Sequence, residues 1–246
     1  MATAIKPDNA ELKNFIAEVK RAATAQFASP KYKKLLALPL TIERAQIYTL
    51  QKTLWTFNRR DCWAFAQALS PMDVKKLVWA HEEDELSGNK ARNMGDHFSL
   101  QVKSAELFGL TRADFENTVM RPETRTCLYA WVHLGKDSPW LKSIAASIAL
   151  EVSNSAEWVE GGGMSYRMGK RFEEDLDIPF SKNINAKEHS EVDIEHAHML
   201  LQVVRRHATT KAQLDLVMEG LTESWAVERV WKGLLHDMMA ELPGPR

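Results

Sequence analysis

Apolar residues recur every three or four positions along most of the chain, which is the spacing of one face of an α-helix. In the segment 8–28, the apolar positions that share a face are Leu12, Phe15, Ile16 and Val19. The segment 41–69 begins with the capping residue Thr41 and keeps helical spacing to its end, which predicts one long helix. No segment of useful length alternates apolar and polar residues as a half-buried strand does.

Turn residues divide the rest of the chain into further helical segments. Ser-Pro pairs open two of these segments, and glycines close others. The remaining predicted helices span 70–86, 96–110, 111–118, 122–135, 138–160, 164–176, 185–207 and 210–242. Because no long linker or internal repeat separates them, the pattern predicts an all-α fold, a single helical-bundle domain over 1–246 with about eight helices. Residues 1–8 are expected to be flexible.

Composition narrows the class of protein. The 246 residues are 45% hydrophobic and carry a net charge of about −1, with basic and acidic residues interspersed. This predicts neither nucleic-acid binding nor a membrane span, since there is no basic stripe and no apolar run of membrane length. The two cysteines, Cys62 and Cys127, lie in separate helical patterns, which favours a reducing, cytoplasmic compartment.

The segment 185–207 carries the most specific polar pattern. Relative to His189, Asp193 lies about 40° away around the helix and His196 about 20° away on the other side, so the three share one stripe. His198 points elsewhere. Two imidazoles and a carboxylate on one helical face are typical of ligands that a helix supplies to a transition metal, although the segment also fits a solvated polar helix.

Other segments offer partners for such a stripe. Glu151 shares a face with Ile144, Ser147 and Ile148, where a lone carboxylate is costly to bury unless it is paired or bound. The segment 70–86 ends in a run of acids, and His97 follows after a loop.

Together these segments resemble the heme-oxygenase-like diiron oxygenases, which are related to the TenA-like and pyrroloquinoline quinone synthase-like proteins. The resemblance rests on "HSEVDIEH", which fits the family's H-x3-D-x2-H element, on "HFSLQVKSAELFGL", on "DELSG" and on the Trp-containing last helix. It implies a heme-oxygenase-like bundle and two Fe²⁺ ions per chain, with manganese or a mixed pair also possible. The metal ligands that it implies are Glu85, His97, Glu151, His189, Asp193 and His196.

Two of these assignments have alternatives in the sequence. The loop between Glu85 and His97 is long for the resemblance, so Glu82, one turn earlier, can replace Glu85. Glu157 would give the usual spacing to the histidine helix, whereas Glu151 follows the small apolar run that the resemblance predicts.

The resemblance implies an oxidoreductase that activates O2 to oxidise a small substrate bearing an amine or a carboxylate, such as an amino acid or a fatty acid. An external electron donor and a homodimer are compatible with it. Cationic residues that could hold a carboxylate are Arg59, Arg60, Arg167, Lys170 and Arg171. The alternatives are a metal-free TenA-like hydrolase, which needs a cysteine nucleophile such as Cys127, and a cofactor-free oxidase like the pyrroloquinoline quinone synthases.

Overall fold

The computed structural model describes residues 10–89 and 94–245, except for the side chains of 190–195. All regular elements in these residues are helices. The expected flexibility of residues 1–8 therefore lies outside the described residues. The α-helices are α1 (Ala10–Gln26), α2 (Pro30–Ala37), α3 (Ile42–Asn58), α4 (Arg60–Leu69), α5 (Met72–Ser87), α6 (His97–Ala105), α7 (Arg112–Asn117), α8 (Pro122–Asp137), α9 (Trp140–Asn154), α10 (Met164–Leu176), α11 (Ile184–His207) and α12 (Lys211–Ala240). Two short 3-10 helices, η2 (Glu106–Phe108) and η3 (Phe180–Lys182), complete them.

The prediction of an all-α fold is confirmed for the described residues, but the prediction of about eight helices is wrong, because twelve α-helices are present there. One cause is a break in the predicted helix 41–69, which divides at Arg59 into α3 and α4. Thr53, Thr56 and Asn58 each hydrogen-bond with their side chains to the carbonyl four residues earlier. Such bonds compete with the backbone ladder and bend helices. The short helix α2, which is not among the predicted segments, adds to the count.

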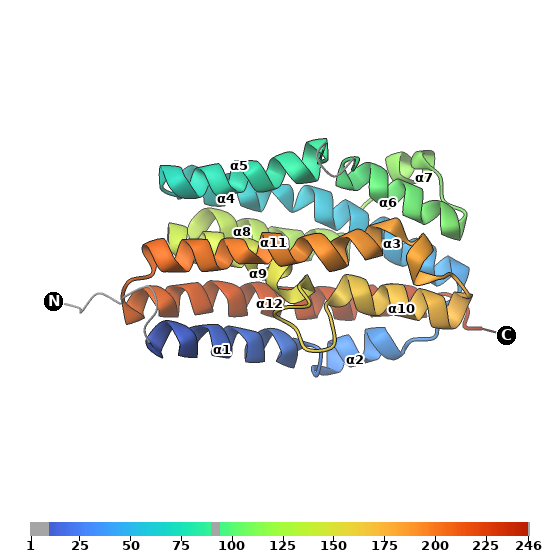
Figure 1. Ribbon diagram of the computed structural model, residues 1–246. Coiled ribbons are helices and arrows are strands. Elements are labelled where there is room, and N and C mark those ends of the chain that lie inside the picture. Colours follow the sequence, from blue (N-terminus) through green and yellow to red (C-terminus); the bar gives the residue numbers. More distant parts are fainter. Residues whose placement is uncertain (1–9, 90–93, 246) are drawn as a thin grey trace.

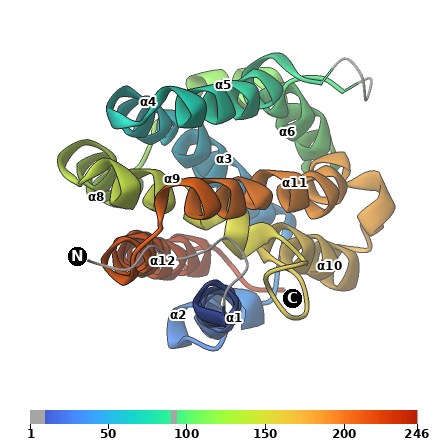
Figure 2. The same ribbon diagram turned by 60° about the vertical axis from the view of Figure 1, so that its left-hand side comes forward.

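Helix α9 lies at the centre of the molecule and contacts α4, α8, α10, α11 and α12. Figures 1 and 2 show the long helices running roughly side by side around it. All its residues from Ser143 to Ser153 are buried, and many of them are alanine or serine. Small side chains let neighbouring helices approach closely: a Cβ on Gly220 of α12 would lie 2.4 Å from the carbonyl oxygen of Lys142. A carboxylate on α9 is therefore held inside the bundle.

The loop between α5 and α6 brings two predicted ligand positions together. Gly88 ends α5 with a φ of 77°, and a Cβ there would meet the carbonyl oxygen of Met94 at 2.5 Å. Asp96 then caps α6 by accepting hydrogen bonds from the backbone N–H and the hydroxyl of Ser99. This arrangement turns the chain back so that the end of α5 faces His97, the first residue of α6.

None of the described helices is long and apolar enough to span a membrane.

Candidate metal centre

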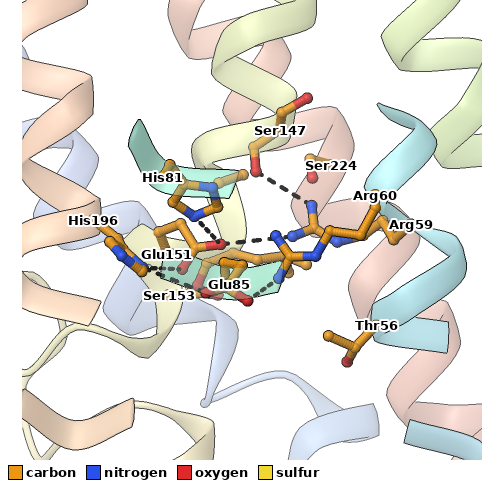
Figure 3. Close-up of polar contacts among 12 residues, drawn as sticks. Thr56, Arg59, Arg60, His81, Glu85, Ser147, Glu151, Ser153, His196 and Ser224 are labelled. Atoms are coloured by element: carbon orange, nitrogen blue, oxygen red, sulfur yellow. Dashed lines mark hydrogen bonds and ion pairs between the residues drawn. The ribbon is translucent and has the colours of Figure 1, made fainter. Parts of the chain in front are cut away.

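Five buried side chains from four helices form a His/carboxylate cluster: His81 and Glu85 from α5, His97 from α6, Glu151 from α9 and His196 from α11. Glu85 Oε2 lies 2.9 Å from His97 Nδ1, and Glu85 Oε1 lies 3.6 Å from His196 Nδ1. The carboxylate of Glu151 lies 3.8 Å from His196 Nδ1 and 3.6 Å from His81 Nε2. Figure 3 shows His81 and His196 beside each other, with both rings close to Glu151. Two carboxylates thus sit among three imidazoles.

His189 belongs to the same region. Its ring centroid lies 4.8 Å from that of His97, nearly at right angles to it. Burial, together with the positive charge of Lys52, lowers the pKa of His189 to about 4, which keeps the imidazole neutral, as a metal ligand requires. Asp193, the remaining predicted ligand, has a side chain that lies outside the described residues. The structure therefore brings five of the six predicted ligands into one region.

His81 is a member of the cluster that the sequence reasoning missed. One ligand atom each from His81, Glu151 and His196 lies within 4.8 Å of the others, close enough to share one ion. The signal was present, because His81 and Glu85 are four residues apart on one helix, the same spacing as His189 and Asp193.

The second nitrogen of His81 is held by a carboxylate, as is typical of metal-binding histidines. His81 Nδ1 hydrogen-bonds Glu82 Oε1 at 2.9 Å, which leaves Nε2 directed at Glu151. Burial alone would lower the pKa of His81, but Glu151 and Glu82 raise it to about 9. The metal-free cluster therefore holds a proton on this ring, which a bound cation would displace.

Several imidazole nitrogens of the cluster have no hydrogen-bond partner although they are buried. They are His81 Nε2, His97 Nδ1 and both ring nitrogens of His196. Each faces a carboxylate oxygen at 2.9 to 4.0 Å without the alignment of a hydrogen bond. Unsatisfied buried polar atoms are costly and require an explanation. Nitrogen and oxygen donors arranged in this way fit a transition-metal ion, so the residues present pass the chemical test for an iron site.

Two arginines from the junction of α3 and α4 neutralise the carboxylates. Arg60 donates to Glu82 at 2.7 Å and also contacts Glu85. Arg59 Nη2 lies 3.7 Å from Glu151 Oε1, and its Nη1 donates to the carbonyl of Ser147. Figure 3 shows both guanidinium groups reaching the cluster from the same side.

The pKa values of the two buried carboxyls reflect this surrounding of cationic groups. Burial raises the pKa of a carboxyl group, but Arg60 and His97 hold that of Glu85 well below its usual range. His196 and His81 do the same for Glu151. Both carboxylates are therefore ionised at neutral pH and available as ligands.

The alternative acids occupy different positions. Glu82 lies beside the cluster but is engaged by Arg60 and His81. Glu157 lies outside the bundle, where its side chain is 41% exposed and Oε2 contacts His198 Nε2 at 2.6 Å. The structure thus places Glu151 rather than Glu157 among the histidines, and it places His198 away from them.

A central cavity of about 60 Å³ opens beside the cluster. Glu85, Glu151 and His189 line it together with cations and aromatic residues, including Lys52, Trp55, Arg59, Arg60 and Lys232. Of the five cations proposed to hold a substrate, Arg59 and Arg60 line this cavity. The other three have contacts elsewhere: Arg167 donates to the carbonyls of Gly162 and Glu160, Lys170 to Glu173, and Arg171 to the carbonyl of Leu36.

The cysteines do not have the surroundings of a nucleophile. Cys62 and Cys127 are buried, and burial raises the pKa of each thiol to about 11. A reactive cysteine needs a lowered pKa and access to solvent or substrate. The geometry therefore disfavours the cysteine-dependent hydrolase.

The amino-acid sequence of residues 46–229 matches a model of the iron-containing redox enzymes. The chain belongs to this family. The match spans most of the molecule and includes every member of the His/carboxylate cluster. It confirms the resemblance on which the predicted ligands rest, and it agrees with the chemistry of the donor atoms. No curated protein sequence matches the chain.

Solved structures of heme oxygenase-like, CADD-like and TenA proteins have the same fold. A domain of unknown function with a heme oxygenase-like fold from Shewanella denitrificans aligns over 95% of this chain and 92% of its own, with 15% identity and a TM-score of 0.67. A CADD-like protein of unknown function from Nostoc punctiforme aligns over 96% and 100%, with 14% identity and a TM-score of 0.65. A TenA homologue from P. horikoshii aligns over 90% and 98%, with 14% identity and a TM-score of 0.57. At these identities the likeness establishes the heme-oxygenase-like fold alone.

Proposed function

We propose that the protein is a non-heme iron oxidoreductase that uses O2 to oxidise a small substrate bearing an amine or a carboxylate. The proposed ligands of two iron ions are Glu85, His97, Glu151, His189, Asp193 and His196, with His81 as a further ligand. Manganese, or one ion of each metal, suits the same donor atoms. Iron bound here would supply the activation of O2 and the electron transfer that amino-acid side chains alone do not provide.

The observation that carries the proposal is the arrangement of His81. Its Nδ1 is fixed by Glu82, while its buried Nε2 has no hydrogen-bond partner and faces Glu151. A buried imidazole that is oriented on one side and open toward a carboxylate on the other is the geometry of a metal ligand.

The protein's own residues would perform four tasks in this reaction. Glu82 orients the ring of His81, and Arg59 and Arg60 balance the charge of the carboxylates. The bundle excludes bulk water, since Glu85 and Glu151 are 2% and 7% exposed. The cations that line the central cavity place positive charge where a substrate carboxylate can lie.

Metal content tests the proposal directly. We expect protein loaded with ferrous iron under argon, and then desalted, to retain two iron ions per chain. His196→Ala should lose most of this iron, since His196 contacts both buried carboxylates. His81→Ala should lose part of it. Glu157→Gln is the matched control. Because Glu157 contacts His198 outside the cluster, this variant should retain as much iron as the wild type.

Oxygen consumption completes the test. Iron-loaded wild-type protein should consume O2 faster than His196→Ala when mixed with aerated buffer, and a substrate should accelerate this further. Wild-type protein that retains no more iron than His196→Ala would refute the proposal. Retention of iron with equal O2 consumption in both proteins would refute the oxidoreductase role.

A further inference from the structure

A groove of about 160 Å³ between α5 and α11 reaches the His/carboxylate cluster. His81 and His196 line this α5–α11 groove, whereas Glu85, Glu151 and His189 line the central cavity. The groove and the central cavity have no described residue in common. The cluster therefore lies between two separate spaces, and the groove is a second way to reach it.

The α5–α11 groove is open to solvent and wide enough for a hydrated ion. Ala80 and Gln202, which line it, are exposed, and the side chain of Asp84 is 33% exposed. Since one water-sized group needs about 10–15 Å³, the groove holds roughly eleven to sixteen such groups and the central cavity roughly four to six. A divalent ion with about six water ligands therefore fits the groove but not the central cavity.

Asp84 and His196 give the groove two atoms that can bind a metal ion. Asp84 Oδ2 lies 4.0 Å from His196 Nε2, and Asn89 donates to the Asp84 carboxylate at 3.2 and 3.3 Å, which holds it in place. A carboxylate has about four acceptor sites, so lone pairs remain for an ion. His196 is 7% exposed, yet its Nε2 has no hydrogen-bond partner. Metal ions bind such atoms at about 2.0–2.2 Å, so an ion fits between the two.

The central cavity is a poorer entrance for a cation. Each of the described carboxylates that line it lies beside an arginine or a lysine: Glu85 beside Arg60, Glu151 beside Arg59 and Glu228 beside Lys232. No lysine or arginine is among the described residues that line the α5–α11 groove. Because a carboxylate attracts an incoming cation and a guanidinium group repels it, Asp84 favours approach through the groove.

We propose that Asp84 and His196 Nε2 form an entry site, at which a divalent metal ion is captured from solvent before it moves into the cluster. The carboxylates of the cluster lie on the other side of the same ring, since His196 Nδ1 is 3.6 Å from Glu85 and 3.8 Å from Glu151. Neither ring nitrogen has a hydrogen bond, so the imidazole can rotate as the ion passes without breaking one. Capture in the groove is independent of the proposed function, and only the transfer to the cluster rests on it.

Stopped-flow uptake of Co²⁺ by the metal-free full chain tests this inference. Co²⁺ binds the same nitrogen and oxygen ligands as ferrous iron, and its visible absorption changes when it leaves water. We expect Asp84→Asn to take up Co²⁺ about tenfold more slowly than the wild type, because it removes the charge that attracts the ion. The final Co²⁺ content should be equal, since Asp84 is not a proposed ligand of the cluster. Added salt should slow the wild type more than Asp84→Asn.

Further variants separate charge from access. Asp84→Glu keeps the charge and should take up Co²⁺ within about twofold of the wild-type rate. Ala80→Phe narrows the groove without changing its charge, and it should slow uptake as Asp84→Asn does. Glu83→Gln is the matched control. Glu83 adjoins Asp84 but lines a different pocket, between α4 and α5, so its loss should change the rate by less than about twofold.

Equal uptake rates for the wild type, Asp84→Asn and Ala80→Phe would overturn the entry site and leave the proposed function standing. Loss of final Co²⁺ content in Asp84→Asn would also overturn it, because Asp84 would then be a ligand of the cluster. A wild type that binds no Co²⁺ would overturn both proposals. Slowed uptake in Asp84→Asn, with no O2 consumption by the iron-loaded wild type, would support the entry site and refute the proposed function.

Discussion

Arg60 neutralises the carboxylate region in the metal-free protein, and replacing it by methionine tests whether a metal ion takes over that role. Its guanidinium group donates to Glu82 at 2.7 Å and contacts Glu85, whose side chain is 3% exposed. Removing one partner of a buried ion pair costs about 3–5 kcal/mol. The imidazole of His97, 2.9 Å from Glu85, can share the uncompensated charge, so we take the lower value of about 3 kcal/mol.

For metal-free Arg60→Met, this cost should lower the melting temperature by about 6–12 °C, since each kcal/mol shifts the midpoint of a domain of this size by about 2–4 °C. If iron binds as proposed, a cation compensates Glu85 in the iron-bound protein, so we expect Arg60→Met to cost about 1 kcal/mol there. The difference of about 2 kcal/mol corresponds to metal binding about 30-fold tighter in the variant than in the wild type.

Differential scanning calorimetry of both proteins, with and without ferrous iron under argon, measures this cycle. Arg112→Met is the control, because Arg112 pairs with Glu116 on the surface and its loss should cost about 0.5 kcal/mol or less in either state. Arg60→Lys retains the charge and should fall between the wild type and Arg60→Met. An equal loss of stability with and without iron would refute the reasoning, because it would mean that no cation replaces Arg60 beside Glu85.

Three further predictions concern the thiols, a close backbone contact and acid stability. Because burial raises the pKa of Cys62 and Cys127 to about 11, iodoacetamide at pH 8 should modify them at least about a hundredfold more slowly in the native protein than in urea, as mass spectrometry can follow. Gly163→Ala should lower the free energy of unfolding in urea by about 1–3 kcal/mol, because the added Cβ would lie 2.2 Å from the carbonyl oxygen of Asn154 at the end of α9. Gly95→Ala is the control: its Cβ would lie 3.9 Å from the nearest atom, so the free energy of unfolding should change by less than about 0.5 kcal/mol. The folded state lowers the pKa of Glu151, so the ionised carboxylate stabilises the fold above the unfolded pKa of 4.5, and this stabilisation is lost as the pH falls below 4.5. In thermal melts of the metal-free proteins, Glu151→Gln should therefore lose less stability than the wild type between pH 4.5 and pH 3.

Helical periodicity and caps were sufficient to predict the all-α fold, because both are local properties of the sequence. The break at Arg59 was not predictable from breakers, since neither proline nor glycine lies there. It follows from side-chain bonds to the preceding turn, which threonine and asparagine form only in some contexts. This break is one reason why the predicted number of helices was wrong, and the unpredicted short helix α2 is another.

The candidate site was predictable where its residues share one helix or an unusual environment. Glu151 was identified because a carboxylate on a face of small apolar residues must be compensated, and the structure places it among three cationic or imidazole groups. His81 was not predicted, although its spacing to Glu85 equals that of His189 to Asp193. A cavity that contains Lys52 and Asn185 depends on α3, α6, α10 and α11 meeting, and no local pattern reveals it.

The junction at Arg59 and Arg60 has a consequence for how the molecule assembles. The two residues are consecutive in the chain, yet Arg59 pairs with Glu151 on α9 and Arg60 with acids on α5. One dipeptide therefore joins three helices. Both guanidinium groups leave water when this junction docks. The cost of their desolvation is compensated only when the helix that carries the acidic partner, α9 for Arg59 and α5 for Arg60, is already in place. We therefore expect closure of the carboxylate region and completion of the bundle to be coupled during folding.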